Sequence, residues 1–183
     1  MTGLAAGLGA AAREAIERHD EWDVPHEFLT LHWDGSRVVP RLVAAILLDM
    51  PAPAIPGIMA SMAAEQRDRG PGDLACGYLL RIEEFGVTLP AGGFPTAAER
   101  ERFQADRRNR TFHQRPDAVE AATAWVAAPN GRLWSATHTR DDPSRIMESA
   151  YAPGLGRMPG GHFIVAILGV AASYGAAPVP DAS

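Results

Sequence analysis

The sequence contains no lysine, because all 17 of its basic residues are arginine. A P-loop needs a lysine to reach the nucleotide phosphates, and Schiff-base enzymes need a lysine amine, so the chain alone can support neither chemistry. The chain has 183 residues and is 46% hydrophobic and 21% charged, which is typical of a single folded domain. Its net charge of −5 gives no general attraction to nucleic acid.

Cysteine is also scarce, since Cys76 is the only one. A single cysteine cannot form an intramolecular disulfide or the CxxC pairs of zinc and redox sites, which fits a reducing compartment. The longest apolar run, residues 163–172, is much shorter than the roughly 20 residues of a membrane-spanning helix. Residues 4–10 lack a basic flank and predict the start of a helix rather than a secretion signal. We therefore expect a cytoplasmic protein without a membrane segment.

Helices are predicted in several parts of the chain. Apolar residues recur at spacings of three and four over residues 4–19, and a second helix is predicted over 58–67. The capping-box pattern at Thr96–Glu99 predicts a helix that ends near Asn109. Residues 163–173 favour a buried helix, although their β-branched content leaves a strand open, and the apolar run 42–50 fits either.

Strands are predicted between these helices. Residues 28–33 alternate and are followed by Asp34-Gly35, a turn signal, so a return strand is expected at 37–39. Pro40 cannot donate to a ladder and places that second strand at an edge or a bulge. Residues 76–89 predict one long strand.

The clearest pattern is a hairpin of residues 121–128 and 132–140 around Pro129-Asn130-Gly131, where Asn-Gly predicts a type I′ turn. Regular βαβ alternation is missing along the chain. We therefore predict an α+β fold, with a mainly antiparallel sheet of about five strands and helices packed on one face. The prediction is one domain over residues 1–175, followed by a flexible tail over 176–183.

The densest polar cluster, residues 19–27, holds two histidines and four acidic residues. His19, Asp23 and His26 are its candidate ligands for a divalent metal. The spacing matches neither HExxH nor an EF-hand loop, so a helix end followed by an acidic turn is the favoured interpretation. A partner-binding patch is a third interpretation, and we expect no cofactor, with a divalent metal as the alternative.

Other histidines lie apart from this cluster. His32 and His138 lie on different predicted strands, where a sheet can bring two imidazoles together, and His162 lies at a possible helix start. A single histidine on a sheet is usually a half-exposed polar residue. The sequence has no GxSxG motif, and Cys76 is interpreted as a packing residue. None of these residues defines a catalytic set.

Residues 154–161 are rich in glycine and precede a predicted helix. Backbone amides and a guanidinium at such a place can hold an anion. Pro159 lacks an N–H and interrupts the pattern, so a flexible loop is the favoured interpretation. The candidate anion-binding residues are Gly156, Arg157, Gly160 and Gly161.

The charge is unevenly distributed. Residues 99–115 contain six arginines and three acidic residues, a net charge of +3, which leaves −8 for the rest of a chain of net −5. The interspersed acids favour a solvated helix, and the scarcity of aromatic residues makes nucleic acid an unfavoured partner. Trp125 and Trp134 flank the hairpin turn and are interpreted first as core. The candidate partner-binding residues are Arg100, Arg107, Arg108, Arg110, Trp125 and Trp134.

The segment from Glu14 to Asp23 and the hairpin from Ala124 to Arg140 resemble parts of small uncharacterised proteins of actinobacteria and their phages. The resemblance implies an accessory or host-interaction role and identifies no site. We therefore expect a protein that binds another macromolecule, either a protein partner or a second copy of itself. The alternative is a small metal- or nucleotide-dependent enzyme or ligand-binding protein that uses histidine and carboxylate side chains.

Overall fold

The computed structural model describes residues 3–46, 54–68, 75–87, 94–109, 111–153 and 162–175. None of the helices in these ranges is both long and apolar enough to cross a membrane. The predicted α+β class is confirmed. In chain order the elements are α1 (Leu4–Glu17), β1 (His26–Trp33), β2 (Val38–Ile46), α2 (Ile55–Asp68), β3 (Gly77–Val87), α3 (Ala97–Asn109), the 3₁₀ helix η2 (Phe112–Gln114), β4 (Ala118–Ala127), β5 (Leu133–Thr139), β6 (Met147–Tyr151) and α4 (His162–Tyr174).

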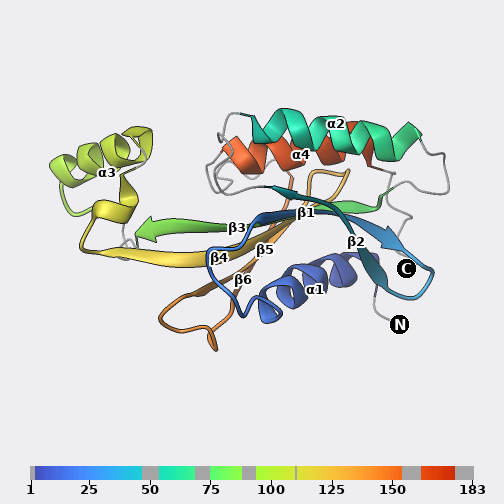
Figure 1. The fold of residues 1–183 in the computed structure, drawn as a ribbon, viewed down its shortest axis with the longest axis horizontal. Coiled ribbons are helices and arrows are strands. Elements are labelled where there is room, and N and C mark those ends of the chain that lie inside the picture. Colours follow the sequence, from blue (N-terminus) through green and yellow to red (C-terminus); the bar gives the residue numbers. More distant parts are fainter. Residues whose placement is uncertain are drawn as a thin grey trace.

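The strands form one antiparallel sheet in the order β2-β1-β3-β4-β5-β6 (Figure 1). The sheet has six strands rather than about five, because the prediction missed β6. Residues 147–150 of β6 are exposed, so its sequence carries no apolar alternation. β2 lies at the opposite edge, as Pro40 predicts, since an edge strand tolerates the missing N–H.

Helices cover both faces of this sheet, whereas the sequence predicted one. α1 packs on one face, and α2 and α4 lie together on the other (Figure 1). The reason is visible in β3, where Leu79 faces α1 while Tyr78 and Leu80 face α2 and α4. All three are buried, so both faces of this strand belong to hydrophobic cores.

α1 lies close to the sheet because small side chains meet on both surfaces. Ala12 and Ala15 of the helix are buried in the same cluster as Ala122 and Ala124 of β4. Gly7 also contributes to this close approach, since a Cβ built there would lie 2.9 Å from Cγ2 of Val38. Gly7 therefore weakens the helix locally but lets α1 lie close to β2.

The predicted hairpin is confirmed, but the predicted turn type is wrong. Gly131 has a φ of +80°, whereas Asn130 has no positive φ. The Gly131 N–H donates to the Ala128 carbonyl at 3.0 Å, and the Ala128 N–H donates to the Arg132 carbonyl at 2.9 Å. These bonds define a three-residue loop with a type I turn and a left-handed glycine. Pro129 causes this choice. A type I′ turn on Asn130-Gly131 would need an N–H from Pro129 to pair with Arg132, and proline has none, whereas its negative φ suits the first central position of a type I turn.

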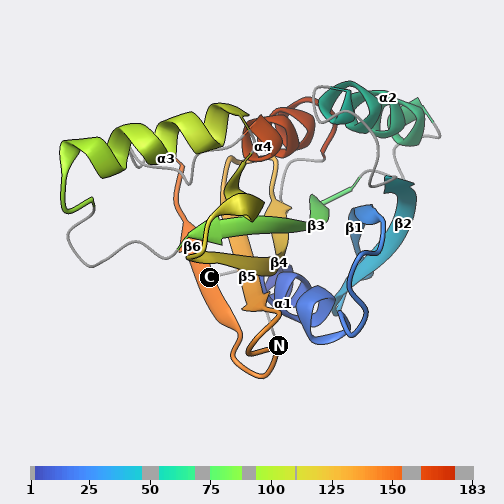
Figure 2. The same cartoon turned by 60° about the vertical axis from the view of Figure 1, so that its left-hand side comes forward.

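α3 extends beyond the end of the sheet (Figure 2). It is tied to its surroundings by Phe103, whose ring lies 4.9 Å from that of Phe94 and 5.0 Å from that of Phe112. The predicted capping box is confirmed, since the Thr96 hydroxyl accepts from the Glu99 N–H at 3.1 Å. Residues 163–173, for which the sequence left both helix and strand open, lie in the helix α4. The predicted tail, residues 176–183, lies outside the described residues.

Candidate functional site

Three strands place a gap between two polar side chains on the α1 face of the sheet. Glu83 of β3 pairs with Ala122 of β4, and Ala122 pairs with His138 of β5. Because neighbouring strands are about 4.8 Å apart, Glu83 and His138 are separated by roughly 10 Å with only a methyl group between them. This gap has room for one more side chain from above the sheet.

His19 fills the gap. It follows the end of α1, and its Nδ1 lies 2.9 Å from Nε2 of His138 while its Nε2 lies 3.0 Å from Oε1 of Glu83. Only 5% of His19 and 2% of His138 are exposed. Trp22 covers both rings, with its own ring edge-on to His19 at 4.8 Å and stacked on His138 at 5.5 Å. We call Glu83, His19, His138 and Trp22 the histidine cluster.

The hydrogen-bond partners of this cluster limit how the protons of its two histidines can be arranged. His138 Nδ1 lies 3.3 Å from the carbonyl of Pro143, which only accepts, so this nitrogen carries a proton. A neutral His138 then accepts from Nδ1–H of His19, and Nε2–H of His19 donates to Glu83. The reverse arrangement, with His138 donating to His19, needs the same number of protons. In both arrangements one proton lies between the two facing nitrogens.

Glu83 also ties down the chain between α1 and β1. Its Oε2 accepts from the Asp23 N–H at 2.8 Å, and its Oε1 accepts a longer bond of 3.4 Å from the Val24 N–H. Asp23 has a φ of +63°, a left-handed conformation that aspartate tolerates better than most residues. Glu83 therefore joins β3 to the segment after α1 through two backbone N–H groups.

The environment of His138 resists further protonation. Burial lowers the pKa of His138 below its ordinary value, and the neighbouring His19 acts in the same direction. The hydrogen bond to the Pro143 carbonyl acts in the opposite direction and is the smaller effect. A second proton on the imidazole pair is therefore unfavourable at neutral pH.

Three carboxylates meet at the edge of the cluster. Oxygens of Asp23, Glu83 and Glu120 lie within 4.8 Å of one another. Arg140 lies among them, with Nη1 2.8 Å from Glu120 and Nη2 3.8 Å from Asp23, and its guanidinium lies 5.4 Å above the Trp22 ring. Arg140 therefore places a positive charge among these carboxylates from within the chain.

The residues predicted as metal ligands are not brought together. His26 points to the α2 and α4 face, because it alternates with buried Phe28, whereas His19 lies over the α1 face. Both ring nitrogens of His19 have protein partners. Asp23 belongs to the carboxylate group, which is the one set of three ligand atoms this close within the described residues. Burial lowers the pKa of His26.

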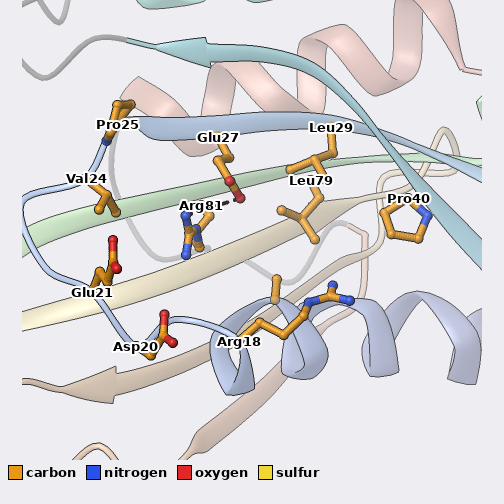
Figure 3. Close-up of a pocket in the computed structure, with 11 residues that line it drawn as sticks. Arg18, Asp20, Glu21, Val24, Pro25, Glu27, Leu29, Pro40, Leu79 and Arg81 are labelled. Atoms are coloured by element: carbon orange, nitrogen blue, oxygen red, sulfur yellow. Dashed lines mark ion pairs between the residues drawn. The ribbon is translucent and has the colours of Figure 1, made fainter.

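A cavity of about 410 Å³ lies between the end of α1 and the sheet (Figure 3). Leu29 and Leu79 provide apolar lining, and Nη2 of Arg81 pairs with Oε2 of Glu27 at 3.2 Å. Arg18 reaches toward it from α1 and has no ion-pair partner among the described residues. The full lining is Ala15, Arg18, Asp20, Glu21, Val24, Pro25, Glu27, Leu29, Pro40, Leu79 and Arg81.

A second cavity of about 340 Å³ adjoins the first, since Arg18 and Pro40 line both. We call the two together the α1 groove. The groove exists because α1 packs mainly over β4 and β5 and leaves part of β1 and β2 uncovered on the same face. The second cavity is lined by Gly7, Ala10, Ala11, Glu14, Arg18, Trp33, Ser36, Arg37, Val38, Val39 and Pro40.

The residues predicted to bind a partner do not form one surface. Trp125 is buried on the α2 and α4 face, whereas Trp134 packs on the α1 face against Gly9. Arg100 and Arg108 are exposed on α3. Five predicted positions lie outside the described residues, namely Arg110 and the anion-binding Gly156, Arg157, Gly160 and Gly161. The side chain of Arg107 is not described either.

His32 and His138 are not brought together either. Nε2 of His32 lies 2.9 Å from the hydroxyl of Thr30, two residues away on the same side of β1. That side faces α2 and α4, and His138 lies on the other. Sequence reasoning therefore found His19 and His138 as separate residues and missed their contact, together with Glu83, Arg81 and Arg140.

Comparison of the chain with models of protein families, with curated proteins and with solved structures gives no match.

Proposed function

We propose that the protein is a non-enzymatic binding module that holds an extended segment of a partner protein in the α1 groove. The observation that carries this proposal is the groove itself, two adjoining cavities of about 410 and 340 Å³ beside β1 and β2. Each is within the range of about 300–1,000 Å³ in which proteins bind small groups, and together they suit several successive side chains.

The charges of the groove favour a polypeptide over a nucleic acid. Its lining carries both signs, in a mixture that is close to neutral. A nucleic acid needs a clear excess of positive charge along its backbone, whereas a peptide segment with both signs finds partners at such a rim. The cations are Arg18, Arg37 and Arg81, and the anions are Glu14, Asp20, Glu21 and Glu27.

The buried reactive side chains favour binding over catalysis. The imidazoles of His19 and His138 are covered by Trp22, and their facing nitrogens bond to each other. Cys76 is buried, and burial raises the pKa of its thiol to about 11, so little thiolate forms at neutral pH. A catalytic group must reach its substrate, and none of these three lines the α1 groove.

The proposal is tested with two matched variants of α1. Ala10 is exposed and lines the second cavity, so Ala10→Trp fills the groove without entering the core. Ala6 is exposed on the same helix and lines neither cavity, so Ala6→Trp is the control. Peptides are selected from a random displayed library against the unaltered protein, and their affinities for all three proteins are measured by fluorescence anisotropy.

The proposal predicts that selected peptides bind the unaltered protein and the control equally, and bind Ala10→Trp at least about tenfold more weakly, a difference of about 1.4 kcal/mol. A library that yields no binder would overturn the proposal. Peptides that bind all three proteins alike would overturn it as well, because they would occupy another surface.

A further inference from the structure

The segment from His19 to Pro25 separates the histidine cluster from the α1 groove. On one side, His19 and Trp22 contact His138, and the Asp23 N–H donates to Glu83. On the other side, four residues of the same segment line the larger cavity. They are Asp20, Glu21, Val24 and Pro25. The cluster is therefore in a position to set the shape of one wall of the groove.

We propose that the histidine cluster is an acid-sensitive latch, which holds this segment as a wall of the groove and releases it when the imidazole pair takes up a second proton. With one shared proton, each of the facing nitrogens has a donor or acceptor opposite it. With two, the nitrogens of His19 and His138 that lie 2.9 Å apart both carry protons and both rings are charged. No placement of the protons then keeps that hydrogen bond.

The charged groups around the pair support this assignment. Glu83 faces His19 from β3, and Glu120 of β4 and Asp23 of the segment itself lie next to Glu83. These carboxylates lie on the Glu83 side of the imidazole pair. Arg140, beyond the end of β5, pairs with Glu120 and lies 3.8 Å from Asp23, so a positive charge already stands among these carboxylates. On the other face of the sheet, burial lowers the pKa of His26, while the charge of Glu83 raises it and the charge of Arg81 lowers it further.

The direction of the response follows from His138. Its pKa is lowered from 6.5, mainly by burial, so the second proton enters only when the pH falls below that value. The latch is closed at neutral pH and opens in acid. Release frees the N–H groups of Asp23 and Val24, which are held by Glu83 while the latch is closed.

These two amides provide a test that needs no partner. Their hydrogen-exchange protection factors are measured by NMR between about pH 7.5 and pH 5, in the unaltered protein, in His138→Gln and in His113→Gln. Glutamine at 138 can accept from Nδ1–H of His19 through Oε1 and cannot be protonated in this range. His113 is exposed and lies outside the cluster, so His113→Gln is the control.

The latch predicts that protection of Asp23 and Val24 falls at least about tenfold in acid in the unaltered protein and in the control, and persists in His138→Gln. Equal loss in His138→Gln would overturn it. If that variant does not fold, the chemical shifts of the His138 ring nitrogens are followed by NMR in the unaltered protein instead. If they show that His138 takes up a proton while both amides stay protected, the latch is overturned as well. Either failure leaves the Ala10→Trp comparison untouched, so the two proposals fail separately.

Discussion

At the scale of single residues, Ala122 is as important to the candidate site as its polar side chains. It is fully buried between Glu83 and His138, and its methyl group leaves the space that the His19 ring occupies. A larger side chain there would displace His19 from both of its hydrogen bonds. The site therefore depends on a position that carries no chemistry.

Ala122→Leu is predicted to lower the free energy of unfolding by about 2–3 kcal/mol, through overpacking and the loss of buried hydrogen bonds. Urea denaturation at neutral pH measures this. Ala121→Leu is the matched control, because Ala121 faces the opposite side of the sheet and is only half-buried, so its cost should be smaller. Equal stabilities of the two variants would show that the gap over Ala122 is not needed.

The lowered pKa values of His138 and His26 predict a stability that depends on pH. Both histidines bind a proton more readily in the unfolded chain than in the folded one. Their contribution to the free energy of unfolding is therefore fully present above the unfolded pKa of 6.5 and is lost as the pH falls below it. Urea denaturation at about pH 7.5 and pH 5.5 should show this loss. His138→Gln should reduce it without abolishing it, because His26 remains. A stability that rises on acidification would contradict the assignment.

The position of Arg140 among the three carboxylates of Asp23, Glu83 and Glu120 predicts that they bind added metal ions weakly. Because its guanidinium already pairs with Glu120 and lies near Asp23, added Mg²⁺, Mn²⁺ or Zn²⁺ should shift the melting temperature of the protein by less than about 1 °C. Arg140→Gln removes that cation and should increase the shift. A purified protein that carries one metal ion per chain would instead favour the alternative of a metal-dependent protein.

At the scale of elements, local patterns predicted most helices and the hairpin correctly. The capping box at Thr96, the spacing of apolar residues in α1 and the Asn130-Gly131 pair are all readable within a few residues. β6 was missed because an exposed edge strand needs no apolar alternation. The turn type was wrong because Pro129 outweighs the preference of the pair that follows it.

The helix glycines give a matched pair of predictions. Gly169 lies in the middle of α4, and a Cβ there would meet nothing within 4 Å, so Gly169→Ala should stabilise the protein by up to about 1 kcal/mol through helix propensity. At Gly7 of α1 a Cβ would lie 2.9 Å from Val38, so Gly7→Ala should lose that gain to the contact. Thermal denaturation measures both, and a more stable Gly7→Ala would contradict the close packing of α1.

At the scale of the whole molecule, the contacts of the candidate site could not be predicted from one sequence. His19 lies 64 residues from Glu83 and 119 from His138, and they meet because of the pairing of β3, β4 and β5. A shift of one residue in either register would turn one of these side chains to the opposite face. His19 and His138 were recognisable as candidates, whereas their contact was not.

The arrangement of layers also explains the α1 groove. Two helices, α2 and α4, cover one face together, while the single helix α1 covers only part of the other (Figure 1). The uncovered part beside β1 and β2 is lined by leucines and by charges of both signs. A face that is half covered by its own helix is suited to a segment from another chain.

The central claim is that this groove binds a polypeptide, and amide chemical-shift mapping with a peptide from the displayed library tests it most directly. The account predicts that the largest shifts fall on residues along the groove, Arg18, Leu29 and Leu79 among them. Shifts confined to Arg100 and Arg108 of α3, or to the hairpin around Trp125 and Trp134, would contradict it and return the binding surface to the positions that the sequence first indicated.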